Sequence, residues 1–346
     1  MVAIFRIDNN AENLRAYLFQ SGYLKEGEQH EITPLGGGVS NDVFKVMSDR
    51  GAVVFKQALP QLRVKDDWFV EPDRANIEKD YLKLIRDLLG PKYAPRVVWE
   101  DEENYLFAME FAPPGSEMWK AQLLRGEVDF SVAEQVAQIL AVMHNRTYEN
   151  EAVVQHFDNQ QRFIDLRVDP YFETIARRHP ELEREIRAEI NRILTLRKTL
   201  VHGDYSPKNI LVTPGAEQIW LLDGEVAHIG DPTFDTGFLL NHLLLKAVHM
   251  PAVSERLFEA FLRMGRSYLE TISVFAPDWI EENTCRELGL LLLARVDGKS
   301  PAEYLTEADR AIIRTASTRI IREQPVRFGD LVDVLQTEVQ RARQTN

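Results

Sequence analysis

The sequence predicts an α+β chain in two parts: an antiparallel five-stranded sheet with a helix, then a larger and mainly helical part. Two observations predict this division. Short segments rich in β-forming residues, separated by turn residues, recur between positions 31 and 110. Beyond Ser131, most of the chain instead spaces its apolar side chains with the period of amphipathic helices.

The elements of the first part follow in order. Residues 10–20 form a short amphipathic pattern, and residues 74–89 carry apolar side chains at helical spacing until Gly90-Pro91 ends the helix. The remaining segments alternate with turns, which favours an antiparallel meander. The five predicted strands are 31–35, 43–47, 53–57, 97–99 and 105–110.

A proline-rich segment at 111–115 favours an extended, helix-free crossing, so we place the domain boundary there. The predicted domains are residues 1–112 and 113–346. In the second domain, residues 131–144 are predicted to be a helix with Ser131 as its N-cap and Glu134 completing a capping box.

A β-rich patch at 200–229 interrupts the helical part, and helices resume from Thr236. This patch contains the most informative residues of the chain.

Composition narrows the function classes. The chain has 346 residues and a formal net charge of -13, which argues against nucleic acid or an anionic membrane as its main partner. Cys285 is the single cysteine, so no intrachain disulfide can form and a reducing compartment fits. The first residues lack the pattern of a signal peptide, and the apolar runs are too short for a membrane span. We expect a cytoplasmic protein.

One pair of motifs predicts phosphoryl transfer from ATP. Asp204 is followed by Asn209 five residues later, and Asp223 lies fourteen residues beyond Asn209. This spacing is typical of a catalytic loop and a metal-binding aspartate. A hydroxyl is a weak nucleophile, so a carboxylate must orient it, which suits Asp204. Mg²⁺ prefers oxygen ligands, which suits Asn209, Asp223 and the nearby Glu225.

Turn chemistry is the alternative for this pair. Asp204 and Asn209 are both turn formers, and Asp223-Gly224 is a common hairpin turn. Either motif alone fits a turn equally well, but the two together, each after a β-rich run, favour the catalytic interpretation.

A glycine-rich loop lies between the first two predicted strands. In Gly37, Gly38, Ser40 and Asn41 we see backbone N–H groups that could cover the phosphates of ATP. An ordinary glycine-rich hairpin turn is the alternative. A dinucleotide-binding loop is disfavoured, because a strand follows these glycines where that motif opens a helix.

Lys56 ends an apolar strand, as a phosphate-pairing lysine does in kinases. Glu78 lies on the following helix where it could pair with Lys56, although Glu71 and Glu110 compete. The alternative for Lys56 is an exposed strand lysine. The adenine of ATP is expected near Glu110 and Ala112.

Taken together, these motifs resemble the aminoglycoside phosphotransferase/choline kinase superfamily: His202-Gly203-Asp204 with Asn209, then two carboxylates one residue apart. Glycine replaces the arginine that protein kinases have at position 203, which points to small-molecule substrates. The resemblance implies a protein-kinase-like, two-lobed fold, with an ATP-binding N-lobe (1–112) and a C-lobe (113–346) that holds the catalytic loop, the metal and the acceptor. It also implies ATP and Mg²⁺ as cofactors. Whether the chain forms a homodimer is left open.

Within that superfamily, the segment 54–64, followed by Trp68 and Arg74, is most similar to the 5-methylthioribose kinases. The chain departs from that family at Gly224, where the family usually has proline, and in the residues that follow Asp204. The resemblance implies 5-methylthioribose as the acceptor. An aminoglycoside, choline, ethanolamine or a homoserine-like compound remain alternatives, as does a catalytically silent nucleotide-binding module that regulates a partner.

The resemblance also suggests roles for residues outside these motifs. Trp68 either shields the substrate or caps the lysine strand. Arg295 either meets the substrate or is a structural arginine at a helix end. Asp235 is similar to the buried aspartate that braces the catalytic loop, and His202 is expected to be a hydrogen-bonded core histidine.

Overall fold

The computed structural model describes residues 4–36, 40–63 and 69–345, and the chain forms two compact units. The first unit comprises Met1–Ser116 together with Trp220–Glu225. The second unit comprises Glu117–Ile219 and Val226–Asn346. The backbone therefore leaves the second unit at 219, contributes six residues to the first unit, and returns.

An antiparallel five-stranded sheet forms the first unit, with the strand order β1-β2-β3-β5-β4. This confirms the sheet that the sequence predicted. Its strands are β1 (His30–Pro34), β2 (Asn41–Ser48), β3 (Gly51–Ala58), β4 (Val97–Asp101) and β5 (Leu106–Glu110).

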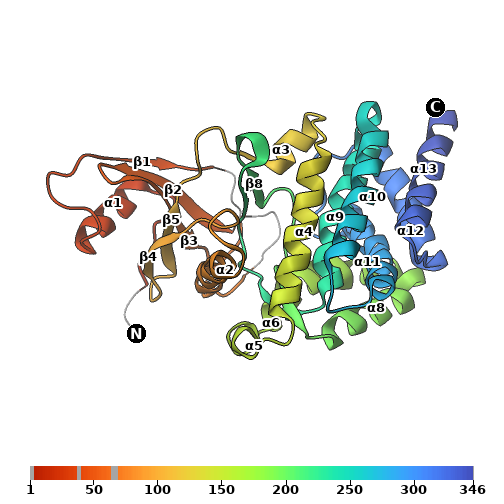
Figure 1. Cartoon of the computed structure of the whole chain (residues 1–346), viewed down its shortest axis with the longest axis horizontal. Coiled ribbons are helices and arrows are strands. Elements are labelled where there is room, and N and C mark those ends of the chain that lie inside the picture. Colours follow the sequence, from red (N-terminus) through yellow and green to blue (C-terminus); the bar gives the residue numbers. More distant parts are fainter. Residues whose placement is uncertain (1–3, 37–39, 64–68, 346) are drawn as a thin grey trace. The chain divides into compact units, whose positions relative to one another are not determined.

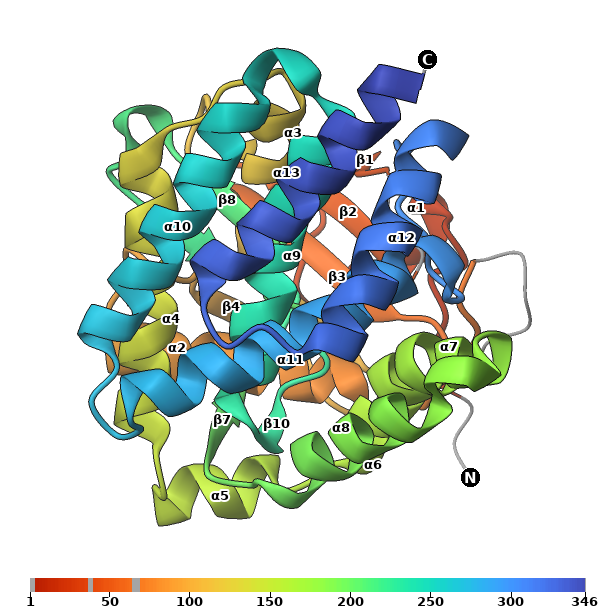
Figure 2. The same ribbon diagram turned by 90° about the vertical axis from the view of Figure 1, so that its right-hand side faces the viewer.

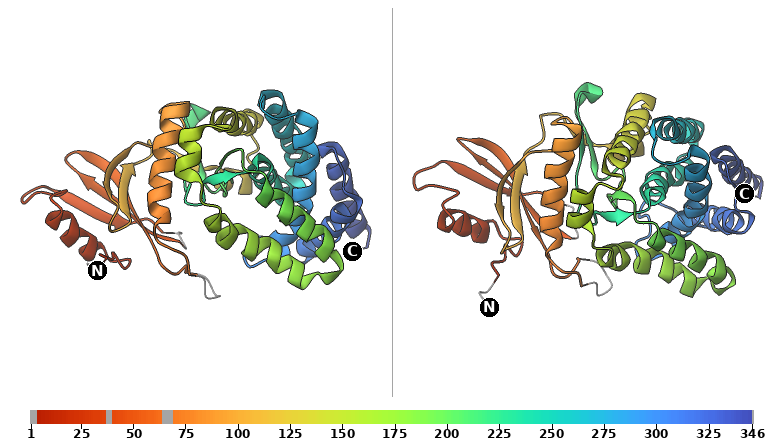
Figure 3. Two further views of the ribbon diagram at one scale, coloured as in Figure 1. Left: turned by 90° about the horizontal axis from the view of Figure 1, so that it is seen from below. Right: turned by 60° about the horizontal axis from the view of Figure 1, so that its bottom comes forward.

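Two helices, α1 (Ala11–Gln20) and α2 (Arg74–Leu89), pack on opposite faces of this sheet (Figures 1 and 3). Phe55 of β3 belongs to the hydrophobic cluster that includes Leu14 of α1. Successive side chains of a strand point to opposite faces, so the neighbouring Lys56 points toward α2. The strand thus presents a lysine on the face that α2 covers.

The second unit is mainly helical (Figure 2). Its long helix α9 (Pro232–His249) is mostly apolar and is buried along almost its whole length. Residues Ile164–Glu173 form a π-helix, a rare element that often occurs at functional sites. The other α-helices are α3 (Trp119–Leu124), α4 (Phe130–Thr147), α5 (Glu151–Phe157), α6 (Gln161–Phe163), α7 (Thr174–Arg178), α8 (Glu183–Thr195), α10 (Ser254–Thr271), α11 (Pro277–Asp297), α12 (Glu307–Glu323) and α13 (Phe328–Thr345).

Short strands account for the predicted β-rich patch. In the second unit β7 (Thr199–Val201) pairs antiparallel with β10 (His228–Gly230), and β6 (Glu117–Met118) pairs antiparallel with β8 (Ile210–Val212). The chain passes into the first unit along β9 (Ile219–Leu221).

Two predicted helix starts were wrong. Helix α4 begins at Phe130 with Asp129 as its N-cap, because the Asp129 carboxylate accepts the N–H of Ser131 at 2.8 Å. Ser131 therefore lies inside the helix. Helix α9 begins before the predicted Thr236, because the side chain of Asp231 caps it. In both cases an aspartate just upstream satisfies the first backbone N–H groups.

Among the helices of the described residues, none combines the length and apolar character that crossing a membrane requires.

Candidate active site

Lys56 is the centre of a buried ion-pair cluster in the first unit. Its side chain on β3 is only 6% exposed, so it is not the exposed strand lysine that the alternative interpretation required. The Nζ atom lies 2.7 Å from the carboxylate of Glu78 on α2 and 2.5 Å from Oδ1 of Asp223. The pairing of Lys56 with Glu78, expected from helical spacing, is confirmed. Glu110 instead pairs with Arg96.

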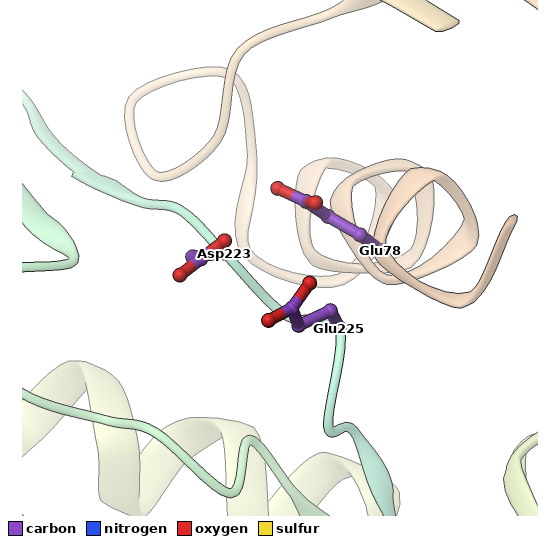
Figure 4. A group of neighbouring side chains, drawn as sticks. All are labelled: Glu78, Asp223 and Glu225. Carbon is purple, nitrogen blue, oxygen red and sulfur yellow. The ribbon is translucent and has the colours of Figure 1, made fainter. Parts of the chain in front are cut away.

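Three carboxylates lie close together in this cluster, and Figure 4 shows their side chains. Glu78, Asp223 and Glu225 each offer an oxygen, and these oxygens lie within 4.8 Å of one another. Asp223 adopts a left-handed backbone conformation with φ of 65°. A Cβ on Gly224 would lie 2.3 Å from Cδ1 of Tyr81, so only glycine allows this approach to α2. The close packing explains why this chain has glycine between its two carboxylates.

Arg74 of α2 connects Glu225 to the ends of two strands. This fully buried side chain donates to Oε2 of Glu225 at 3.1 Å. It also donates to the carbonyl oxygens of Ser40 at 2.5 Å and Leu59 at 2.7 Å. Asn41 Nδ2 donates to the same Glu225 oxygen at 3.2 Å. Glu225 is therefore held in place by two donors.

The charges of this cluster shift the pKa values of its members. Burial, reinforced by Asp223 and Glu225, raises the pKa of Glu78 to about 7 although Lys56 opposes the shift. Burial would lower the pKa of Lys56, but the attraction of Asp223, Glu78 and Glu225 outweighs burial and raises it. With Lys56 and Arg74 against three carboxylates, the cluster favours additional positive charge.

Hard divalent cations suit this donor set. Carboxylate and amide oxygens are the ligands that Mg²⁺ prefers. Besides the three carboxylates, Oδ1 of Asn41 is buried and has no hydrogen-bond partner among the described residues. The residues present therefore fit a magnesium ion held by Asp223 and Glu225.

The loop 202–209 of the second unit carries Asp204 and is fixed from below by Asp235. The Asp235 oxygens accept the backbone N–H groups of His202 at 2.6 Å and Gly203 at 2.9 Å. Gly203 has φ of 75°, and a Cβ there would lie 2.7 Å from Cγ1 of Val226. The brace expected at Asp235 is confirmed, and His202 is a buried histidine whose Nδ1 accepts the N–H of Asp204.

Asp204 contacts two cations within the second unit. Its Oδ2 lies 3.0 Å from Nη2 of Arg167 and 2.9 Å from Nζ of Lys208. Arg167 also donates to the carbonyl oxygen of Gly203 at 2.5 Å, so it fixes both the backbone and the carboxylate. Asn209 donates from Nδ2 to the Asp204 carbonyl at 3.0 Å and closes the loop.

The remaining predicted site residues lie as follows. Ala112 is in the irregular segment after β5, and Arg295 lies in the last turn of α11. Arg295 donates to Tyr171 Oη at 3.2 Å and to Ser300 O at 2.5 Å. The residues outside the described part of the chain are Gly37, Gly38 and Trp68.

Sequence reasoning missed Arg167, which belongs to the π-helix, and the role of Arg74 at Glu225. The π-helix had no recognisable spacing in the sequence, so no signal placed Arg167 beside Asp204. Arg74 entered the sequence analysis only through the resemblance, and its partner Glu225 lies 151 residues away in the sequence.

Comparison with known proteins identifies related sequences. Residues 31–277 match a family described as "Phosphotransferase enzyme family". Methylthioribose kinase 1 of Oryza sativa subsp. japonica is 30% identical over 242 residues, which cover 62% of this chain and 56% of that protein. The methylthioribose kinase of Escherichia coli is 27% identical over 254 residues, or 65% of this chain and 59% of the relative. This chain therefore spans less than two thirds of the length of either relative.

A solved structure shares the fold. The Plasmodium vivax ethanolamine kinase aligns with 98% of this chain, and 90% of that protein is covered, at 15% identity and a TM-score of 0.52. The α+β, kinase-like fold predicted from the sequence is thus confirmed.

Proposed function

We propose that this chain, which belongs to the phosphotransferase enzyme family, is a kinase that transfers the γ-phosphate of ATP to a hydroxyl group of a small molecule. One observation carries this proposal: the buried Lys56 pairs with Glu78 of α2 while Asp223 and Glu225 offer oxygens beside it. A strand lysine, a helix glutamate and an acidic ligand after the catalytic loop are the parts that position ATP in kinases.

In the proposed reaction, each group has a distinct task. Lys56 holds ATP phosphates together with backbone groups near Ser40 and Asn41. Asp223 and Glu225, with Asn209, are the proposed ligands of Mg²⁺, which when bound would neutralise the phosphate charge. The adenine is proposed to lie near Glu110–Ala112.

Asp204 is the proposed base. It orients the acceptor hydroxyl and accepts its proton as the oxygen forms a bond to the γ-phosphorus. The bond from that phosphorus to the bridging oxygen breaks, and ADP leaves. Arg167 positions Asp204 through its contacts with the carboxylate and with the carbonyl of Gly203.

For the acceptor, 5-methylthioribose is the first candidate, because the relatives at 27–30% identity carry the name methylthioribose kinase. The charges near Asp204 bear on the alternatives. Arg167 and Lys208 both contact the carboxylate, so a cationic acceptor such as choline, ethanolamine or an aminoglycoside would meet like charge. Neutral and anionic acceptors, including a homoserine-like compound with its carboxylate, fit better.

The test is ADP release measured against a panel of acceptors: 5-methylthioribose, other pentoses, homoserine, choline and an aminoglycoside. We expect Asp204→Ala to reduce turnover with the best acceptor at least about 100-fold, since general-base catalysis contributes that much. ATP binding, measured by calorimetry, should survive. The exposed Asp165→Ala is the matched control, because Asp165 lies on the same unit and contacts only Gln161 among the hydrogen bonds described.

Undiminished turnover in Asp204→Ala would exclude the proposed base. ADP release that no acceptor stimulates, with ATP binding intact, would favour the silent nucleotide-binding module instead.

A further inference from the structure

One face of α9 carries a stripe of buried side chains, two of them polar, that have no role in the proposed reaction. Phe238, His242 and Lys246 follow one another at intervals of four residues, which places them on the same side of the helix. All three are buried, and Lys246 is 0% exposed. A lysine at that depth in an otherwise apolar helix is uncommon and needs an explanation.

The stripe faces residues of two other segments. The Phe238 ring lies 5.9 Å from the ring of Tyr171, and the guanidinium of Arg167 lies 5.8 Å from the centre of the Phe238 ring. Further along, Nζ of Lys246 lies 5.1 Å from the centre of the Tyr304 ring. The π-helix and the segment after α11 thus pack against this face of α9.

Arg295 joins the two ends of this arrangement. Its guanidinium lies 6.0 Å from the centre of the Tyr171 ring and donates to Tyr171 Oη and to Ser300. Lys246 donates a hydrogen bond to the carbonyl oxygen of His242 at 3.3 Å. All of these hydrogen-bond acceptors are uncharged. Within residues 4–36, 40–63 and 69–345, no carboxylate forms an ion pair with Lys246 or Arg295.

Three buried polar atoms around the stripe have no hydrogen-bond partner in the described part of the chain. They are Nε of Arg295, Nε2 of His242 and Oη of Tyr304. Buried polar atoms are normally paired, so three unpartnered atoms on three different segments leave hydrogen-bonding capacity for a ligand at this place. Nε of Arg295 can only donate a hydrogen bond, and Oη of Tyr304 can donate as well, which suits an acceptor-rich ligand.

The charges around Lys246 and His242 also favour an anionic ligand. Burial lowers the pKa of Lys246 to about 7, and repulsion by Lys120 and Arg295 adds to this effect. Burial, then Lys246 and Arg295, also hold the pKa of His242 well below its ordinary value. Glu303, the acidic residue that opposes the shift of Lys246, is itself ion-paired with Lys120. The surroundings of Lys246 and His242 are therefore positive, which favours a negative charge at this place.

The cluster is continuous with the proposed base inside the second unit. Arg167, which contacts Asp204, lies 5.9 Å from the centre of the Tyr171 ring, and Tyr171 accepts from Arg295. Arg295 and Tyr304 are partly exposed, whereas Lys246 is fully buried. A molecule that reaches Asp204 with its hydroxyl could thus extend along the same wall.

We propose that Lys246 and Arg295, with His242 and Tyr304, form a subsite for an anionic group of the acceptor, either a carboxylate or a phosphate. This inference rests on the proposed kinase function and narrows its acceptor class to small hydroxylated anions. An anionic acceptor would take the place of 5-methylthioribose as the first candidate, because the thioether of 5-methylthioribose is neutral and its candidacy rests on the names of the relatives alone.

Charge-matched acceptors test the proposal. Ribose and ribose 5-phosphate share the ring and the anomeric hydroxyl, and 5-methylthioribose carries a neutral group at the same carbon. Glycerol and glycerate form a second pair, so the two pairs distinguish phosphate from carboxylate. We expect kcat/KM for the anionic member of at least one pair to exceed that of its neutral counterpart about tenfold or more, measured by ADP release.

Lys246→Met removes the charge and keeps the bulk of the side chain. It should raise the KM for the anionic acceptor about tenfold or more and leave the KM for ATP and the kinetics of the neutral acceptor unchanged. Lys299→Met is the matched control, because Lys299 is exposed, paired with Asp169, and lies on the same unit. Circular dichroism and thermal unfolding establish that both variants fold.

A binding measurement decides the matter without turnover. Inorganic phosphate and sulfate should raise the melting temperature of the wild-type protein and of Lys299→Met by more than that of Lys246→Met, in which only the proposed phosphate site at Lys56 remains. Equal use of neutral and anionic acceptors, or identical stabilisation of all three proteins, would overturn the subsite while leaving the kinase function standing. If no acceptor stimulates ADP release, the kinase function fails, and the anion effect still decides the subsite.

Discussion

Replacing Asp235 by asparagine tests whether one buried carboxylate holds the loop that carries Asp204. Its two oxygens accept the backbone N–H groups of His202 and Gly203 at 2.6 and 2.9 Å, and its side chain is fully buried. Asparagine has nearly the same shape, but only one of its two terminal atoms can accept a hydrogen bond. In Asp235→Asn, one backbone N–H therefore faces another donor.

The expected loss follows from these contacts. A hydrogen bond to a charged acceptor contributes about 1.5–3 kcal/mol, and a negative charge in the first turn of α9 adds about 0.3–1 kcal/mol. Asparagine avoids the desolvation of a carboxylate, which offsets part of the loss. We expect the free energy of unfolding of the second unit to fall by about 2 kcal/mol. For a unit of this size, that lowers the melting temperature by about 4–8 °C.

Thermal unfolding followed by circular dichroism measures this change, with Asp165→Asn as the exposed control. Hydrogen exchange of the amides of residues 202 and 203 reports on the brace itself and should accelerate in Asp235→Asn only. Turnover should fall as well, because Asp204 loses its fixed position. A loss within about 0.5 kcal/mol of the control, together with unchanged exchange at both amides, would refute the reasoning.

Two further predictions concern the first unit. Lys56→Met should reduce kcat/KM for ATP at least about 100-fold, because the lysine stabilises the negative charge that develops on the phosphate. The control is Lys83→Met, a change at the surface of α2. Equal activity of the two variants would exclude a role for Lys56. The pKa of Glu78 lies at about 7 in the folded protein against an ordinary value of 4.5. The folded state therefore binds more protons in this interval, and urea unfolding should show stability falling by about 3 kcal/mol as the pH rises from about 4.5 to about 7. Glu78→Gln should lack this decline, and an equal decline in both proteins would contradict the assignment.

The local elements of this chain were predictable because their signals are local. Strand and turn residues placed the sheet, and apolar spacing placed α2 with bounds identical to the prediction. The partner of Lys56 was also among the predicted candidates, because Glu78 lies on the buried face of the helix that follows the lysine strand.

Contacts between distant segments were not predictable. Arg167 and Asp204 meet only because a π-helix packs beside the catalytic loop, and π-helices have no simple sequence period. Lys246 follows an apolar run, so nothing in the sequence marks it as part of a site. The need for glycine at position 224 became visible only with the ring of Tyr81 in place.

The N-cap of α4 shows a different kind of error. Ser131 and Asp129 are both good caps, and the sequence alone favoured the serine because Glu134 completes a capping box with it. The carboxylate of Asp129 accepts two N–H groups, from Ser131 and Val132, so it begins the helix earlier.

The detour of residues 220–225 into the first unit has a consequence for how the molecule can be divided. A polypeptide ending at Ser116 would contain the whole sheet, yet Lys56 would lack Asp223 and Arg74 would lack Glu225. Both cations are buried, so such a fragment would keep them with fewer counter-charges. Melting of the second unit would withdraw the same six residues. The two units should therefore unfold cooperatively, because residues 220–225 connect them through the backbone. A stable isolated sheet would require residues 220–225 to be added, either through a linker or as a separate peptide.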